Sequence, residues 1–245
     1  MKQEELDIPA DLPRLHYLKL RHQAYSGSKL TFQKDELKNL KYILVEGSNI
    51  TNISFDGGAP ELEKIVLPFT GLKLNGILDL LKLKEVELTY NTSSTNNNSS
   101  DINSRGSTSL SIFKDATQIA KMTLRGTRLK QDDLRDFANK SNISCLMMLD
   151  HSYAESELTF NEDELLKLNL LILNCSNINN ISFHSGSAPK INKIVWSFKE
   201  MKALSGINNL QRLRELEFNG DHVLTQLRTL KERRAMSASG DYGTV

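Results

Sequence analysis

The sequence predicts an α/β solenoid, a fold in which short repeated units stack along one axis and share one core. Three observations support this prediction: an apolar motif recurs nine times, its spacing is nearly regular, and one half of the chain repeats the other. Leucine is correspondingly frequent, at 38 of the 245 residues. A single unit is too small to bury its own apolar side chains, so the units must stack to form a core.

The recurring motif is apolar-x-x-apolar-x-apolar. Its copies start at Leu15, Leu40, Leu62, Leu83, Ile119, Ile143, Leu168, Ile191 and Leu213. One interval is 36 residues and the others run from 21 to 25 residues, which matches the period of about 20–29 residues in leucine-rich repeats. Alternate side chains at the end of each motif would point to one side of a short strand. We therefore expect about nine leucine-rich repeats over residues 15–223, forming an irregular horseshoe. Its parallel β-sheet would line the concave face, and helices and loops would mix on the convex side.

The second half of the chain repeats the first. Residues 30–55 and 158–183 align without a gap and are identical at 14 of 26 positions. Repeats one to four thus correspond to repeats six to nine, with repeat five between them. The segment Asn-Ile-Ser-Phe occurs at 52–55 and again at 180–183. We expect it to build the same structural corner in both halves, because scaffolds repeat and active sites rarely do.

Some segments between the predicted strands have acidic residues where a helix would begin. Such residues suit the positive end of a helix dipole, so residues 35–40, 131–137 and 162–166 are predicted to be helical. Residues 91–109 explain the one long interval, because nearly all of this segment is Asn, Ser or Thr. So polar a segment cannot bury enough apolar surface to order itself, and it is predicted to be a flexible insertion.

The two ends of the chain are predicted to lie outside the repeats. Residues 1–14 are interpreted as an N-terminal linker, because they precede the first motif. Residues 224–245 begin with spaced leucines followed by basic residues, and they are interpreted as a C-terminal capping helix and a disordered tail. Such a cap would cover the apolar side of the last repeat.

Composition and charge exclude several classes of protein. Hydrophobic residues make up 39% of the chain and charged residues 25%, which excludes collagen-like and wholly disordered proteins. The 31 basic and 30 acidic residues leave a net charge of +1, so no partner made of nucleic acid or anionic membrane is expected. No apolar stretch approaches the roughly 18 residues of a membrane span. Residues 1–11 lack the apolar region of a secretory signal, and a cytoplasmic protein is expected.

No motif indicates catalysis or a bound metal. The histidines form neither H-E-x-x-H nor a close pair with a cysteine, and the sequence contains no G-x-S-x-G. Cys145 and Cys175 fall near equivalent strands of two repeats, where packed small side chains are expected rather than a nucleophile. The sequence therefore predicts a protein that is not an enzyme, with no cofactor and no metal site.

The outward positions of the predicted strands are the candidate binding site. Between the last two apolar residues of each motif, one side chain points away from the core, and Met147, Ile172 and Val195 occupy this place on consecutive repeats. The other members of the candidate surface are Leu149, Leu170 and Phe198 beside them, Lys193 and Asp150 at the rim, and Leu44 and Val66 on earlier repeats. An exposed apolar band of this kind marks a partner-binding surface. The alternatives are strand propensity alone or packing against a further domain.

Three segments carry a more specific resemblance. Residues 48–55 followed by Ala-Pro at 59–60, residues 176–183 followed by Ala-Pro at 188–189, and residues 204–221 are similar to the leucine-rich-repeat region of cereal intracellular NLR disease-resistance proteins. The resemblance covers roughly residues 12–223. It implies a cytoplasmic sensor region. In that family the repeats recognise pathogen effectors directly or indirectly, and they hold a nucleotide-dependent switch in its resting state.

The sequence departs from this family in one respect. No G-x-x-x-x-G-K-[ST] loop is present, so the nucleotide-binding module is missing and we interpret the chain as a truncated receptor. The expected partner is a protein: a pathogen effector, a guarded host protein or the receptor's own nucleotide-binding module. Two alternatives remain open. One is a substrate adaptor of a ubiquitin ligase, although the short segment before the repeats leaves no room for an F-box-like segment. The other is an extracellular receptor fragment, which would be glycosylated at its Asn-x-Ser/Thr sites.

Overall fold

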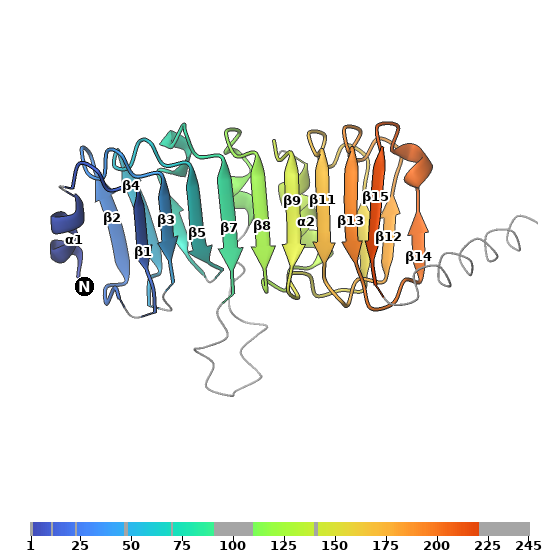
Figure 1. Cartoon of the computed structure of the whole chain (residues 1–245), viewed down its shortest axis with the longest axis horizontal. Helices are drawn as coiled ribbons and strands as arrows, with labels where there is room; N and C mark the ends of the chain where they lie inside the picture. The colour runs from blue at the N-terminus through green and yellow to red at the C-terminus, as the bar shows by residue number, and fades with distance from the viewer. Residues whose placement is uncertain are drawn as a thin grey trace, which may run out of the picture.

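The chain folds as a solenoid of parallel strands (Figure 1). The computed structural model describes residues 2–10, 12–22, 24–46, 49–69, 71–90, 110–139 and 142–220. The expected insertion at 91–109 and the expected cap and tail at 224–245 lie outside these residues. Within the described part, the stacked architecture is the one that the nine motifs predict.

The largest element is a nine-stranded sheet that runs the length of the solenoid. Its strands are β1 (Tyr17–Leu20), β3 (Tyr42–Val45), β5 (Lys64–Pro68), β7 (Glu85–Thr89), β8 (Lys121–Arg125), β9 (Cys145–Leu149), β11 (Leu170–Asn174), β13 (Lys193–Ser197) and β15 (Glu215–Asn219). Figure 1 shows these strands side by side, with their arrows pointing the same way. Each strand coincides with the end of one predicted motif, so the expected strand positions are confirmed.

The register of this sheet aligns the apolar motif positions in rows. One inward row comprises Leu18, Ile43, Ile65, Val86, Met122, Leu146, Leu171, Ile194 and Leu216. The seven central members of this row are at most 1% exposed. The two end members, Leu18 and Leu216, are partly buried against the same core. The stacked rows therefore form one continuous apolar core.

The opposite side of the core contains two smaller parallel sheets. The first consists of β2 (Lys29–Gln33), β4 (Asn52–Asp56) and β6 (Lys73–Asn75), and the second of β10 (Glu157–Phe160), β12 (Asn180–Phe183) and β14 (Ala203–Ser205). Among the described residues, the helices are α1 (Gln3–Ala10) and α2 (Gln131–Ala138), with short 3₁₀ helices η1 (Ile77–Asp79), η4 (Leu110–Phe113) and η5 (Ile207–Asn209). This side is richer in strand and poorer in helix than the sequence predicts.

The predicted helices are confirmed at one place and wrong at two. Residues 131–137 lie in α2, whereas residues 35–40 and 162–166 form turns. In each turn an aspartate and a leucine have positive φ, namely Asp35 (74°), Leu37 (51°), Asp163 (64°) and Leu165 (53°). A right-handed helix cannot contain such left-handed residues. The buried Leu37 and Leu165, at 1% exposure each, are directed into the core by these turns.

Two other expectations about local structure are corrected. The Asn-Ile-Ser-Phe segments do build the same structure twice, but that structure is a strand of each small sheet, β4 and β12, and not a corner. The expected linker at residues 1–14 contains helix α1, whose Leu6 is completely buried. Helix α1 lies at one end of the stack in Figure 1 and contacts β2.

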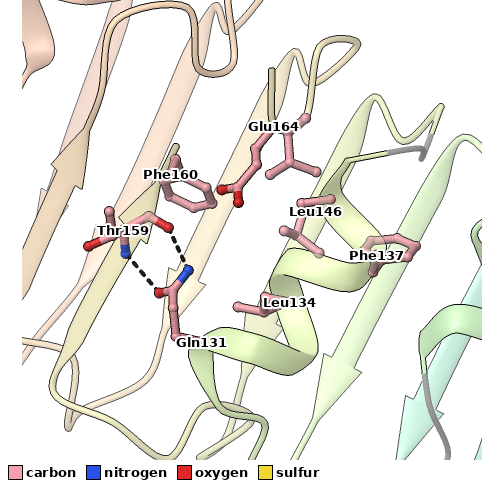
Figure 2. A pocket seen from close by; sticks show the side chains of 9 residues that line it. Gln131, Leu134, Phe137, Leu146, Thr159, Phe160 and Glu164 are labelled. Atoms are coloured by element: carbon pink, nitrogen blue, oxygen red, sulfur yellow. Dashed lines mark hydrogen bonds between the residues drawn. The ribbon is translucent and has the colours of Figure 1, made fainter. Parts of the chain in front are cut away.

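A glutamine at the start of α2 ties this helix to the second small sheet (Figure 2). The Gln131 side-chain amide donates to the carbonyl oxygen of Thr159 at 2.7 Å, and its oxygen accepts from the Thr159 N–H at 3.0 Å. The same oxygen accepts a hydrogen bond from the Tyr153 hydroxyl at 2.9 Å. Burial raises the pKa of the Tyr153 phenol, so the hydroxyl remains protonated and can donate. Every polar group of this clasp is thereby satisfied.

The same clasp exists at the equivalent place in the first half. Gln3 donates to the carbonyl oxygen of Thr31 at 2.7 Å and accepts from the Thr31 N–H at 3.0 Å and from the Tyr25 hydroxyl at 3.0 Å. The duplication therefore reaches back to residue 3, although the gap-free alignment begins only at residue 30. Between residues 3 and 29, few residues are identical in the two halves apart from those of the clasp and some apolar positions.

One equivalent position in each half requires glycine, because another part of the backbone lies too close to leave room for a side chain. Gly76 and Gly206 have φ of 73° and 72° and precede η1 and η5. A Cβ atom at either position would collide with the carbonyl oxygen of Phe55 or Phe183. Both the positive φ and the lack of space therefore require glycine.

Shortening a side chain of the inward row should destabilise the whole solenoid. Leu171 is 0% exposed, and Leu171→Ala should reduce the free energy of unfolding by about 2–5 kcal/mol through lost burial and cavity formation. Urea denaturation followed by circular dichroism measures the change. The control is Leu81→Ala, because Leu81 is 77% exposed and should change stability by no more than about 0.5 kcal/mol. Equal losses in both variants would contradict the assigned core.

Candidate protein-binding surface

The outward face of the large sheet carries a second continuous set of rows. Its middle row comprises Lys19, Leu44, Val66, Glu87, Thr123, Met147, Ile172, Val195 and Glu217. Alternation along each strand places these residues opposite the inward rows. Charged residues occupy the two ends of the row, Glu87 and Thr123 occupy its middle, and apolar residues lie between them. The chemistry of the face therefore changes along the stack.

Six partly exposed side chains on three neighbouring strands form what we call the outer apolar patch. Its members are Cys145, Met147 and Leu149 of β9, Leu170 and Ile172 of β11, and Val195 of β13. Ile172 is in register with Met147 on one side and Val195 on the other. The structure thus brings together five apolar residues that the sequence assigned to the candidate surface. Cys145 was missed, although it lies two residues before Met147 and so on the same strand face.

Three residues assigned to the surface are buried and are corrected here. Leu44, Val66 and Phe198 are only 7%, 5% and 6% exposed. Phe198 follows β13 and packs edge-to-face against Trp196 at 4.9 Å and Phe218 at 6.0 Å between ring centroids. It therefore belongs to the core at this end of the solenoid rather than to the outward face.

Leu44 and Val66 alternate with the inward row, but long charged side chains lie near them. The Lys19 ammonium lies 5.7 Å from the centre of the ring of Tyr42, which is on the same strand as Leu44. Lys64 reaches across to two glutamates of β7, at 3.5 and 3.7 Å. Hydrocarbon stems of such charged side chains cover apolar surface while their heads stay in water. The apolar side chains at these positions are therefore buried in the first half, whereas their counterparts Ile172 and Val195 in the second half are partly exposed.

An ion-pair network borders the outer apolar patch on the N-terminal side. Arg125 of β8 pairs with Asp150, which directly follows β9, and lies 3.6 Å from a carboxylate oxygen of Glu87. Lys121 and Glu85 form a further pair at 3.3 Å. Asp150 thus lies at the rim of the patch, as predicted. These pairs are partly exposed, so they mark a polar border more than they stabilise the fold.

A second network borders the patch on the C-terminal side. The Lys193 ammonium lies 2.7 Å from Glu215 and 3.2 Å from Glu217. The hydrogen bond that the Lys193 ammonium donates to Glu215 contributes most to raising the pKa of Lys193. The pKa of Glu217 is lowered, first by a hydrogen bond from Asn219 and then by one from Lys193. Lys193 is therefore a rim residue whose charge is already paired.

The duplication shows that the fold does not require apolar outward side chains at the β9 positions of this patch. Met147 of β9 corresponds to Lys19 of β1 in the first half, and Leu149 likewise corresponds to Arg21. The two strands have the same place in equivalent units, yet one carries basic outward side chains and the other apolar ones. Exposed apolar side chains that the scaffold does not need are typical of a binding surface.

The cavity beside α2 offers little room for a ligand. The cavity between α2 and β10 shown in Figure 2 has a volume of about 10 Å³, which is room for at most one water molecule. No cluster of three or more metal-ligating side chains occurs among the residues that the structure describes. Among the same residues, no helix has the length and apolarity needed to cross a membrane.

Comparison with known proteins does not add a relative. No protein-family model matches this sequence, and no curated protein matches it significantly. The function proposed below therefore rests on the residues and on the geometry of the surface.

The two cysteines should differ sharply in reactivity. Burial raises the pKa of the Cys145 thiol above its ordinary value of 9.0. Because the thiolate is the reactive form, alkylation of Cys145 by N-ethylmaleimide should be slow at neutral pH and should accelerate as the pH rises past that value. Cys175 is 0% exposed and should not react in the folded protein. Mass spectrometry of timed samples measures both rates, and labelling of Cys175 at the rate of Cys145 would contradict this geometry.

Proposed function

We propose that this protein is a non-enzymatic recognition module that binds a partner protein through the outer apolar patch. The observation that carries the proposal is the patch itself: six half-buried apolar or thiol side chains on β9, β11 and β13, bordered by ion pairs on both sides. Protein interfaces combine an apolar centre with a polar rim in the same way.

The rigidity of the sheet favours binding. Each strand of the patch pairs with neighbours on both sides, because β9 lies between β8 and β11, and β13 lies between β11 and β15. The side chains are therefore held in fixed relative positions before any partner arrives. A preformed surface has little ordering entropy to lose on association, which leaves more of the contact free energy for affinity.

The biological class that we propose is a disease-resistance-type leucine-rich-repeat region acting in the cytoplasm of a plant cell. Its support is the regular motif spacing together with the three segments that resemble cereal NLR proteins. The partner would be a pathogen effector, a guarded host protein or a receptor's nucleotide-binding module. All three are proteins, so each can contact an apolar surface with a charged rim. No cofactor, nucleic acid or membrane takes part in the proposed binding.

Substitution of one residue of the patch by its first-half counterpart tests this proposal. Met147→Lys introduces the residue that occupies the equivalent place at Lys19, so the fold should tolerate it. Burial of an unpaired ammonium at the centre of an interface should weaken partner binding by at least about thirtyfold. The partner would be isolated from infected cereal leaf extract on the immobilised chain and purified. Its Kd for each variant would then be measured by calorimetry.

The reciprocal variant is the matched control. Lys19→Met makes the opposite exchange in the first half and should leave the affinity unchanged, and both variants should unfold at the wild-type urea concentration. A bound partner should also protect Cys145 from alkylation, since Cys145 belongs to the patch. Retention of full affinity by Met147→Lys, or an unprotected Cys145 in the complex, would show that the partner binds elsewhere.

A further inference from the structure

A second feature of the C-terminal half is a basic hollow at the edge where the strands of the large sheet begin. It has a volume of about 320 Å³ and is lined by Asn169, Lys190, Asn192, Gln211, Arg212 and Arg214. This volume is at the lower end of the range of ligand pockets, about 300–1,000 Å³. All six lining residues are polar, three are cationic and none is acidic. The lining therefore suits a small, strongly anionic ligand rather than an apolar one.

The backbone holds the lining residues in a fixed stack. The Asn192 N–H donates to the carbonyl oxygen of Asn169 at 2.8 Å, and the Arg214 N–H donates to the carbonyl oxygen of Asn192 at 2.9 Å. These three residues immediately precede β11, β13 and β15. The hollow is thus built on consecutive repeats of the sheet, which fix the spacing of the backbone from which its side chains extend.

The cations of the hollow are not neutralised within the described part of the chain. No ion pair joins Lys190, Arg212 or Arg214 to another described residue. By contrast, the nearby Lys193 and Glu215 are paired with each other at 2.7 Å. Clustered cations without counter-charges repel one another. An anion placed among them would remove that repulsion.

The first half of the chain shows that this arrangement is not a requirement of the scaffold. The duplication aligns Lys190 with Glu61 and Asn192 with Glu63. In the first half the acids are present, and Glu63 pairs with Lys41 at 3.2 Å. The second half thus carries a cation and an amide at the positions where the first carries two carboxylates. The cations at this place are therefore accompanied by carboxylates in the first half and are without them in the second.

We propose that the basic hollow binds a small soluble ligand with several phosphoryl groups. Arginine presents a planar fork that donates two hydrogen bonds to phosphate oxygens, and the hollow contains Arg212 and Arg214 beside Lys190. The amides of Asn169, Asn192 and Gln211 can donate to further oxygens. Three cations match a ligand with several phosphoryl groups better than a ligand with a single phosphoryl group. This site lies apart from the outer apolar patch and does not depend on the function proposed for that patch.

Calorimetric titration of the full chain with tripolyphosphate, and in parallel with inorganic phosphate, tests the proposal at low ionic strength. Tripolyphosphate should bind at least about tenfold more tightly than inorganic phosphate, because it can contact more than one cation. Its affinity should fall as salt is added, since the contacts are ionic and partly exposed. Absence of binding, or equal affinity for both anions, would overturn the proposal.

Two paired variants separate a built site from general attraction of anions to a basic surface. Arg212→Gln combined with Arg214→Gln should weaken tripolyphosphate binding by at least about tenfold. Lys82→Gln combined with Lys84→Gln removes the same charge from the equivalent places of the first half and should leave the affinity unchanged. Equal losses in the two pairs would show only non-specific attraction and would refute the site.

A third variant restores the first-half pattern and remains informative if a double variant folds poorly. Asn192→Glu introduces the carboxylate found at Glu63, which the scaffold already tolerates, and it should abolish tripolyphosphate binding by pairing with the cations of the hollow. Thermal unfolding without ligand provides the folding control for every variant. Unchanged tripolyphosphate affinity in a folded Asn192→Glu protein would contradict the proposed site.

Discussion

The structure depends on the parallel, in-register pairing of nine strands around one apolar core. Because each strand pairs with the next at equivalent residues, the inward leucines of successive repeats form continuous rows. The same pairing fixes the outward side chains in rows of their own. One outward residue per repeat, such as Ile172 between Met147 and Val195, therefore has neighbours set by the fold. The sheet thereby converts a linear pattern of residues into a surface of defined chemistry.

Comparison of the two halves separates what this scaffold needs from what it allows. The shared features are the part-buried clasps at Gln3 and Gln131 and the buried, stacked rings Phe32–Phe55 and Phe160–Phe183, with centroids 5.1 and 5.0 Å apart. Some outward positions differ instead, as Lys19 of β1 and the following Arg21 are replaced by Met147 and Leu149 of β9. Interiors are closely packed and tolerate little change, whereas exposed side chains change at low cost. Differences between the halves thus identify positions where folding does not determine the type of side chain.

The sequence predicts the nine strands and the core rows because a period of two and a regular repeat are direct consequences of stacking. It fails where neighbouring side chains or unusual backbone decide the outcome. Leu37 is in a left-handed turn that helix propensity cannot reveal, since leucine favours the right-handed form. Leu44 and Val66 have the outward alternation of Met147, yet both are buried. The patch could therefore be located from the sequence, but its boundary required the contacts between strands.

The outer apolar patch and the basic hollow share strands β11 and β13 but remain chemically separate. Lys193 lies between them, in register with Leu170 of the patch and one residue after Asn192 of the hollow. Its ammonium is paired with Glu215 and Glu217, so Lys193 itself is not an unpaired cation beside Leu170. Desolvating a face next to an unpaired cation would oppose the docking of an apolar partner. The pairing of Lys193 therefore lowers that cost at the border between the two surfaces.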